Sequence, residues 1–287
     1  MEPEEAVDQA LEVLAADLEL REAHTHDSHI ALSVSGLAEQ AVIDALGLYL
    51  VGLLAGIVRT NLRLSAALLD RTPEGRAQLA SDVEARLTPP DGASPYAVEH
   101  FVADVRDPWI AEGIGHVILA VRNRVETLCL SGAVAAITVP HGKPSQQGLD
   151  LFAIYNEEGM PAIALGEAKA TRENGSARLT EAISFFRTVE AGDRDVDIRM
   201  QVVLLREALD ESLQQELSGS FWRQRACYLP LIAHGDDLDM SAARPALLAI
   251  ARPATHKRVI YCRPDDYTHF FNAVAAAMRR AVPTINP

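Results

Sequence analysis

The sequence predicts an α/β fold in which a mixed β-sheet is flanked by helices, after an N-terminal third that is mainly helical. The first observation is a hairpin pattern: apolar residues 149–155 and 162–165 enclose a polar turn that contains Gly159. The second is the run 198–205, which is apolar almost throughout, as in a strand buried on both faces. The third is the helical spacing of apolar residues over much of residues 4–87.

The N-terminal third is expected to contain several helices. Residues 4–22 carry apolar side chains at helical spacing and predict an amphipathic helix. Residues 35–87 are expected to be mostly helical, with candidates at 62–69 and at 73–87, the latter capped by Thr72. Residues 41–58 approach the length of a membrane span, but they include an aspartate and three glycines. A buried helix broken near Gly47 is therefore expected in place of a membrane helix.

A histidine-rich segment follows the first expected helix. His24, His26 and His29 lie close together in the sequence, beside Asp27. A metal site is one interpretation, but such a site draws its geometry from ligands on several elements of the fold. A solvated turn is the expected structure.

Residues 88–97 are rich in proline, glycine and serine and predict a linker. The linker divides a mainly helical region, residues 1–95, from a second region, residues 96–287, which ends in a strand and helix extension. The second region is expected to open with a helix at 107–123 that has Asp107 as its N-cap. The elements expected next are a strand at 134–139, the hairpin, a helix at 177–190, the strand at 198–205, a helix at 208–225, strands at 227–233 and 258–262, and a closing helix at 265–282.

The composition is that of a folded, acidic protein. The chain has 287 residues, of which 48 % are hydrophobic and 23 % charged, enough for a sizeable core. Its net charge of −14 argues against tight autonomous DNA binding, because nucleic-acid binders usually present a basic face. A local basic patch, a metal ion or a partner that delivers the substrate would offset this charge. Cys129, Cys227 and Cys262 show no zinc or disulfide spacing and predict reduced core thiols.

The hairpin is expected to bring three charged residues together. Asp150 opens its first strand, and Glu167 and Lys169 close its second. In an antiparallel hairpin the start of one strand lies beside the end of the next, so Asp150 should come close to the other two. Glu167 and Lys169 are two residues apart and therefore leave the same face of the strand. An Asp, a Glu and a Lys are common on solvated surfaces, so the hairpin context carries the prediction.

Two carboxylates and an amine at one point suit the hydrolysis of a phosphodiester bond. Asp150 and Glu167 can hold Mg²⁺ or Mn²⁺, hard cations that take few protein ligands. The cation polarises a phosphate and lowers the pKa of a bound water. Lys169 can orient or deprotonate that water, or stabilise charge on the phosphate. The expected activity is that of a metal-dependent nuclease.

Asp150 followed by Glu167-Ala168-Lys169 resembles the PD-(D/E)XK nuclease superfamily, whose pattern is an Asp, a hairpin-length gap and Glu-x-Lys. Leu149 stands where that pattern usually has proline. A narrower resemblance is to the nuclease subunit of the Hachiman anti-phage defence system, in the stretches Gly148-Leu149-Asp150, Gly166-Glu167-Ala168-Lys169 and the helical run 176–190. The resemblance covers residues 109–205. It implies a restriction-endonuclease-like core with the element order α-β-β-β-α-β, which the expected elements follow.

The resemblance also implies a metal-binding Glu on the helix before the hairpin. At the matching position, after Gly115, this sequence has His116. Glu112 lies one helical turn earlier and can point the same way. Two interpretations stay open: Glu112 or His116 is a further metal ligand, or His116 is a packed core residue.

The polar loop before the hairpin offers candidates for binding substrate phosphate. Side chains that can donate hydrogen bonds to phosphate or sugar lie both there and shortly after Lys169. Solvated loop residues are the alternative interpretation. The candidates are His141, Lys143, Gln146, Gln147, Arg172 and Arg178.

The resemblance implies DNA as substrate, a helicase as controlling partner and a role in prokaryotic anti-phage defence. The N-terminus is acidic and polar, unlike a signal peptide, so a cytoplasmic protein without membrane attachment is expected. One competing interpretation is a catalytically inactive interaction module on a nuclease-like fold, which His116 and the net charge favour. Another is an unrelated α/β protein, in which Asp150 and Glu167 would lie far apart.

Overall fold

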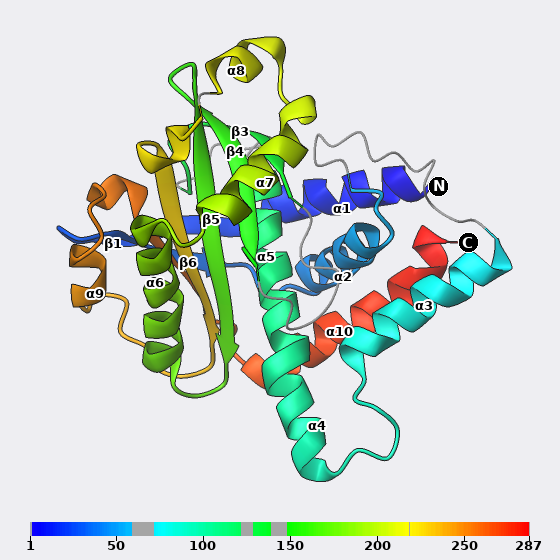
Figure 1. Cartoon of the computed structure of the whole chain (residues 1–287). Helices are drawn as coiled ribbons and strands as arrows, with labels where there is room; N and C mark the ends of the chain where they lie inside the picture. The colour runs from blue at the N-terminus through cyan, green and yellow to red at the C-terminus, as the bar shows by residue number, and fades with distance from the viewer. Residues whose placement is uncertain (1, 59–71, 122–128, 139–147, 218, 287) are drawn as a thin grey trace.

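Seven β-strands form one mixed sheet in the computed structural model, which describes residues 2–58, 72–121, 129–138, 148–217 and 219–286 (Figure 1). The strand order is β1-β2-β7-β6-β5-β4-β3. The pairs β1/β2, β3/β4 and β4/β5 are antiparallel, whereas β2/β7, β7/β6 and β6/β5 are parallel. The strands are β1 (Glu19–Thr25), β2 (Ile30–Ser35), β3 (Ala133–Ile137), β4 (Leu151–Glu157), β5 (Met160–Thr171), β6 (Ala226–His234) and β7 (Arg258–Cys262).

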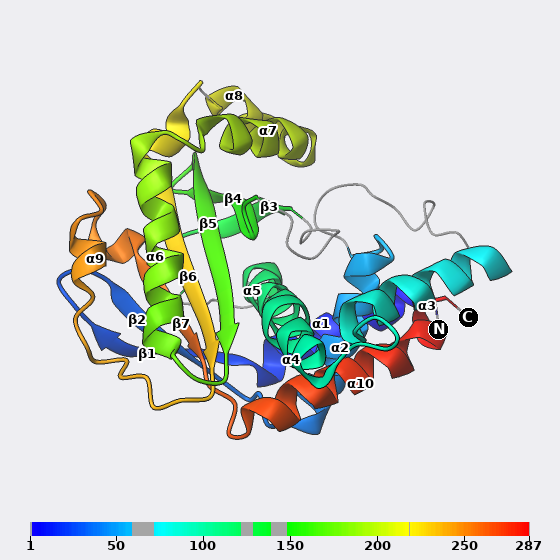
Figure 2. The same ribbon diagram turned by 60° about the horizontal axis from the view of Figure 1, so that its bottom comes forward.

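Helices cover both faces of this sheet, so the predicted α/β class is confirmed (Figures 1 and 2). α5 lies against β5 on one face, together with α1, α2 and α10, and α6 lies along β5 and β6 on the other. A π-helical turn, Val102–Arg106, joins α4 to α5. The α-helices are α1 (Pro3–Asp17), α2 (Gln40–Leu54), α3 (Pro73–Leu87), α4 (Pro95–Phe101), α5 (Asp107–Val121), α6 (Gly175–Ala191), α7 (Asp195–Leu205), α8 (Glu211–Glu216), α9 (Pro245–Leu248) and α10 (Tyr267–Ile285).

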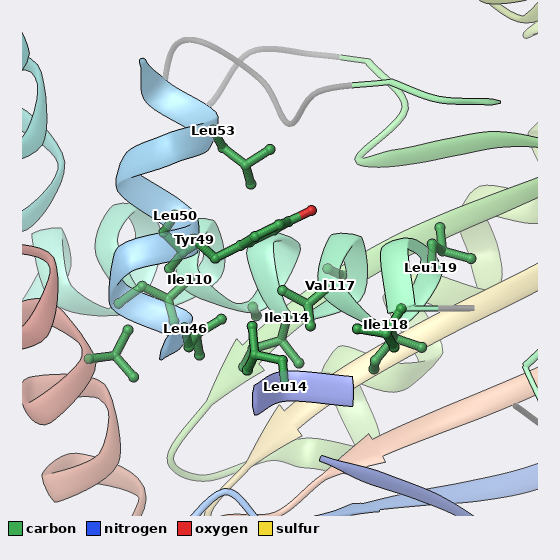
Figure 3. Close-up of a cluster of buried hydrophobic side chains, with 14 of the residues drawn as sticks. Leu14, Leu46, Tyr49, Leu50, Leu53, Ile110, Ile114, Val117, Ile118 and Leu119 are labelled. Atoms are coloured by element: carbon green, nitrogen blue, oxygen red, sulfur yellow. The ribbon is translucent and has the colours of Figure 1, made fainter. Parts of the chain in front are cut away.

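Two apolar cores fill the space between the sheet and the helices. The first joins one face of the sheet to α1, α2, α5 and α10, and Figure 3 shows Leu14 of α1 and Tyr49 of α2 beside Ile114 of α5. The second lies under α6, where the Phe186 ring stacks on Tyr228 of β6 with ring centroids 4.7 Å apart. Because both faces of the sheet are covered, β5 and β6 are apolar along most of their length.

Most elements of the second region lie where the sequence predicts them. The hairpin is β4 and β5, and the predicted elements at 134–139, 177–190, 227–233, 258–262 and 265–282 correspond to β3, α6, β6, β7 and α10. Thr72 caps α3 as predicted, since its hydroxyl accepts a hydrogen bond from the Gly75 N–H at 3.1 Å. The three cysteines are buried thiols, also as predicted.

The N-terminal helix ends earlier than predicted, and two strands follow it. α1 stops at Asp17, and the residues expected to form the helix end and a solvated turn belong to β1, β2 and their connection. The rings of His26 and His29 stack with centroids 4.5 Å apart, and His29 is buried. The cause is tertiary: β2 pairs in parallel with β7, a strand more than two hundred residues away in the sequence.

The first 95 residues therefore contribute strands as well as helices to the molecule. β1 and β2 join the same sheet as the hairpin. The division into two regions at residue 95 stays a prediction. The helix expected at 62–69 falls outside the described residues.

The run at residues 198–205 belongs to helix α7, so the predicted strand is wrong. Ile198, Val202 and Leu205 are buried at helical spacing, while Val203 and Leu204 are exposed on the other side of the helix. A helix that is apolar on two sides cannot be distinguished from a buried strand by periodicity alone. The helix predicted at 208–225 is reduced to α8 and a 3₁₀ turn at Phe221–Arg223.

Two predicted details of the helices are also wrong. α2 continues through Gly47, whose missing side chain lets α10 approach: a Cβ atom there would lie 2.5 Å from the Cβ of Ala277. Asp107 is not an N-cap, because α4 and the π-helical turn run directly into α5. In the ranges that the structure describes, no helix combines the length and apolar character needed to cross a membrane.

The elements around the hairpin follow the predicted order as far as the helix after it. α5, β3, β4, β5 and α6 follow one another along the chain. The strand predicted directly after that helix is replaced by α7, and β6 follows only after α7 and α8.

Candidate active site

The candidate site lies where β5 extends beyond the start of β4. The register of the two strands ends with Leu151 opposite Gly166, so residues 167–171 of β5 have no partner in β4. Asp150 precedes β4 and occupies part of this open edge, because its Oδ2 accepts a hydrogen bond from the Ala168 N–H at 2.9 Å. The predicted approach of Asp150 to the end of β5 is confirmed.

Glu167 and Lys169 form an ion pair on one side of β5. The Lys169 ammonium donates a hydrogen bond to Glu167 Oε1 at 2.6 Å, and the two side chains are 29 % and 11 % exposed, respectively. The neighbouring strand β6 pairs with the same stretch of backbone, with Glu167 opposite Pro230 and Lys169 opposite Ile232. Pairing with β6 therefore holds one edge of β5 at these two residues, while the other edge of the strand is open to Asp150.

Two glycines let Leu151 pack closely behind the site. A Cβ atom on Gly166 would lie 2.7 Å from Leu151 Cδ1, and one on Gly115 of α5 would lie 2.4 Å from the same atom. A close-packed interior has no room for either Cβ atom without moving Leu151. α5 is thereby drawn against the start of β4, and Glu112, one helical turn before Gly115, comes within electrostatic range of Asp150.

Glu112, Asp150 and Glu167 interact as a group of carboxylates, of which Glu167 is buried and the other two are half-buried. Burial raises the pKa of Glu112 well above its ordinary value, and the charges of Asp150 and Glu167 raise it further. Burial also raises the pKa of Glu167, to about 7, again with a contribution from Asp150. The pKa of Asp150 is raised by burial, although the Ala168 hydrogen bond and the charge of Lys169 oppose the shift.

Lys169 is the cation of this group. Burial lowers the pKa of its ammonium, but the attraction of Glu167 and Asp150 outweighs burial, and the net shift is upward. Lys169 therefore stays protonated beside three carboxylates that each resist ionisation. Among the described residues the site has more carboxylates than cations, so an added cation would favour their ionised forms.

The donor set of the site fits a hard divalent cation such as Mg²⁺ or Mn²⁺. Carboxylate oxygens are the preferred ligands of such ions, and Glu112, Asp150 and Glu167 supply them from three separate elements. In the described part of the chain, no three His, Cys, Asp or Glu side chains already have the arrangement of a metal site. Glu167 instead accepts a hydrogen bond from the Lys169 ammonium through its Oε1.

His116 packs in the core, as one of the two interpretations of this residue expects. Its side chain is 1 % exposed, and its Nδ1 lies 2.7 Å from the Tyr49 hydroxyl of α2. Burial lowers the pKa of His116 to about 4, so the ring is neutral at pH 7. Of the two helix residues considered as a further ligand, Glu112 interacts with the carboxylates and His116 bonds to α2.

The proposed phosphate-binding residues are placed only in part. His141, Lys143, Gln146 and Gln147 fall outside the described residues. Arg172 is exposed, lies 3.3 Å from Glu173 and lines a cavity of about 250 Å³ next to the end of β5. Arg178 lines the same cavity and is paired with Glu181 at 3.0 Å.

Glu181 is a neighbour of the site that the sequence did not single out. It lies on α6, and its charge contributes to raising the pKa of Lys169. Its pairing with Arg178 follows the i, i+3 spacing of a helix, which is visible in the sequence. Its approach to Lys169 depends on how α6 packs over β5, and no local pattern reveals that.

Comparisons with known proteins give this chain no family. It matches no protein-family model, and no curated protein matches its sequence. The function of the site is therefore inferred from its own residues: an Asp before one strand, a Glu and a Lys on the next, and a second Glu from the helix behind them.

Proposed function

We propose that this protein is a metal-dependent nuclease that hydrolyses phosphodiester bonds in DNA. The observation that carries the proposal is the meeting of Asp150, Glu167 and Lys169 at the open edge of β5, with Glu112 behind them. Asp150 and Glu167, which an unrelated α/β protein would keep far apart, influence each other's protonation. The carboxylates can attract and bind a cation, and the lysine can act on a bound phosphate or on the attacking water.

Each residue has a distinct role in the proposed reaction. Asp150 and Glu167, with Glu112 as a third donor, would hold Mg²⁺ or Mn²⁺. When bound, such an ion polarises the phosphate and lowers the pKa of a coordinated water. Lys169 stays protonated through its carboxylate neighbours, so it would orient the attacking water and stabilise negative charge on the phosphate.

The order of elements supports a restriction-endonuclease-like core in this proposal. When the intervening helices α7 and α8 are set aside, α5, β3, β4, β5, α6 and β6 follow the order α-β-β-β-α-β, with the acidic residues at the hairpin and on the first helix. Gly115 and Gly166 both leave room for Leu151. Gly166 directly precedes Glu167, and Gly115 precedes His116, the position where the resemblance implies a Glu.

We further propose that a helicase partner controls the nuclease and that the pair acts in the cytoplasm against phage. This step rests on the resemblance to the Hachiman nuclease subunit and on the net charge of −14. A strongly acidic protein gains little from long-range attraction to DNA, so a partner that holds the DNA would supply the substrate.

The nuclease proposal is tested by incubating plasmid and linear DNA with the full chain and Mg²⁺ or Mn²⁺. Wild type is compared with Glu167→Ala and with Glu173→Ala, an exposed glutamate shortly after the site. We expect cutting that needs the metal, that Glu167→Ala abolishes and that Glu173→Ala retains. Cutting by Glu167→Ala at the wild-type rate would overturn the assignment of the site.

An inactive interaction module on the same fold is the second candidate function. Two observations favour it: His116 stands at the expected Glu position, and the described residues have no ready-made metal arrangement. A calorimetric titration with Mn²⁺ separates the two candidates. Heat of binding that is lost in Asp150→Ala supports the nuclease, and the absence of binding in wild type supports the module.

A further inference from the structure

α7 carries most of the large apolar side chains that are exposed in the described part of the chain. Of seven such side chains, four lie on this helix: Val196 at 68 %, Met200 at 59 %, Val203 at 64 % and Leu204 at 61 % exposure. Their spacing of i, i+4, i+7 and i+8 places them on one side of the helix, here called the α7 stripe. An apolar stripe of this kind on a soluble protein marks an interaction site.

The opposite side of α7 is firmly attached to the protein. Ile198, Val202 and Leu205 pack into the second core. At the start of the helix, Asp195 accepts a hydrogen bond from Trp222 Nε1 at 3.2 Å and pairs with Arg223. The α7 stripe is therefore the outer face of an anchored helix.

The α7 stripe lies away from the candidate active site. Figure 2 shows α7 beside the start of β5, opposite the arrowhead of that strand. Glu167 and Lys169 lie near the other end of that strand, which closes at Thr171. A partner on the stripe would leave the carboxylate site accessible.

The surroundings of the α7 stripe are acidic. Between residues 190 and 216 the sequence has eight carboxylates and three arginines, and Arg223 and Arg252 from outside this range pair with Asp195 and Glu190. The eight carboxylates still outnumber these five arginines. Asp197, which pairs with Arg194 at 3.2 Å, and Glu207 lie three residues from Met200 and Leu204, at the two ends of the stripe. The eight carboxylates are Glu190, Asp193, Asp195, Asp197, Glu207, Asp210, Glu211 and Glu216, and the arginines are Arg194, Arg199 and Arg206.

This charge selects among possible occupants of the stripe. A second copy of the chain would place like charges against each other, and the net charge of −14 on each copy adds to the repulsion. Nucleic acid and anionic membranes are opposed for the same reason. A partner surface that combines apolar side chains with Lys and Arg can pack against the stripe and form ion pairs with the carboxylates around it.

We infer that the α7 stripe docks a protein partner through a basic amphipathic segment of that partner, with apolar side chains flanked by Lys and Arg. The inference goes beyond the proposed nuclease and does not depend on it, because α7 contains none of the residues of the carboxylate site. It assigns this end of the sheet to recruitment of a partner and the opposite end to chemistry.

The test uses the full chain and a synthetic 18-residue helical peptide with leucines on one side and lysines on the other. A peptide with glutamates in place of the lysines is the matched control, and binding is followed by fluorescence anisotropy. The double variant Met200→Gln/Val203→Gln removes half of the stripe without changing charge. Leu248→Gln, at a residue that is 63 % exposed on α9, is the matched control variant.

We expect the lysine peptide to bind wild type and Leu248→Gln equally, with its dissociation constant raised about tenfold or more in the double variant. Asp197→Asn/Glu207→Gln is expected to weaken binding as well, most clearly at low salt. Binding that the double variant leaves unchanged, or equal binding of the glutamate peptide, would overturn the inference. So would a dimer in light scattering that the double variant converts to monomer, because a second copy would then be the occupant.

Discussion

Two groups of charged side chains in the described part of the chain differ in their balance of charge. In the first, Arg106 Nε donates to Asp107 Oδ1 at 2.8 Å, and a second guanidinium nitrogen donates to Asn272 at 2.8 Å. The side chains of Arg106 and Asp107 are 10 % and 3 % exposed. In the second, Lys169 is the cation that the described residues place beside Glu112, Asp150 and Glu167. Among the described residues, the first group pairs one cation with one carboxylate, and the second has three carboxylates beside one lysine.

The difference separates a structural ion pair from a functional site. Burial raises the pKa of Asp107, but its charged neighbour Arg106 opposes the shift, and Tyr267 hydrogen-bonds to the carboxylate. At the carboxylate site, burial and neighbouring carboxylates act in the same direction on Glu112 and Glu167. An arrangement that costs stability is expected where function requires it.

The largest expected effects come from removing the cation of each group. With Mg²⁺ present, Lys169→Ala is expected to keep the fold and to lower DNA cleavage by about 10²–10⁴-fold. Arg106→Ala is expected to leave cleavage by the folded protein near wild type. It should lower the free energy of unfolding by about 3–5 kcal/mol, because Asp107 stays buried without its cation.

Cleavage rates and urea unfolding of the same two variants measure this contrast. Cleavage retained by Lys169→Ala would count heavily against the role given to that lysine. A loss of cleavage in folded Arg106→Ala would mean that the two groups are not separate.

A smaller effect is expected from metal binding without substrate. Mn²⁺ at a hundred times its dissociation constant should raise the free energy of unfolding by about 2.7 kcal/mol. The gain should disappear in Asp150→Asn and persist in Asp107→Asn, which removes a carboxylate from the balanced group. Thermal unfolding with and without Mn²⁺ measures both variants, and an equal gain in Asp150→Asn would place the metal elsewhere.

A comparable effect is expected on the pH dependence of stability in the absence of metal. The pKa of Glu167 rises from 4.5 to about 7 on folding, so the folded state holds more protons than the unfolded state between these values. Stability contributed by protonated Glu167 is therefore lost as the pH rises from 4.5 through 7. Relative to wild type, Glu167→Gln should gain up to about 3 kcal/mol from pH 4.5 to pH 8, because each unit of the pKa shift corresponds to about 1.4 kcal/mol. Parallel pH curves of the two proteins would contradict this assignment.

The parts of the site that the sequence predicted depend on local geometry. Glu167 and Lys169 share a face because side chains of a strand alternate, and Asp150 meets them because the turn of the hairpin fixes the register. The choice between Glu112 and His116 could not be made in this way. The surroundings of the two residues depend on the contact of Gly115 with Leu151 and on the hydrogen bond of His116 to Tyr49, which both join distant elements.

The parts of the fold that the sequence missed depend on partners far along the chain. β1 and β2 are strands because β7 is beside them. The sequence of α7 predicts a strand because apolar residues lie on both sides of the helix, in the second core and in the α7 stripe. With both sides apolar, the sequence does not show the period of 3.6 residues that marks an amphipathic helix.

The parallel pairing of β2 with β7 has a consequence for synthesis on the ribosome. About 220 residues separate Ser35 from Arg258, and at roughly 5–20 residues per second their translation takes on the order of 10–45 s. During that interval the edge of β2 that β7 will cover has no partner, and such an edge invites pairing with other chains. All four residues of the carboxylate site emerge before the sheet can close. The residues of the carboxylate site are therefore synthesised before β7, the strand that completes the sheet on which they lie.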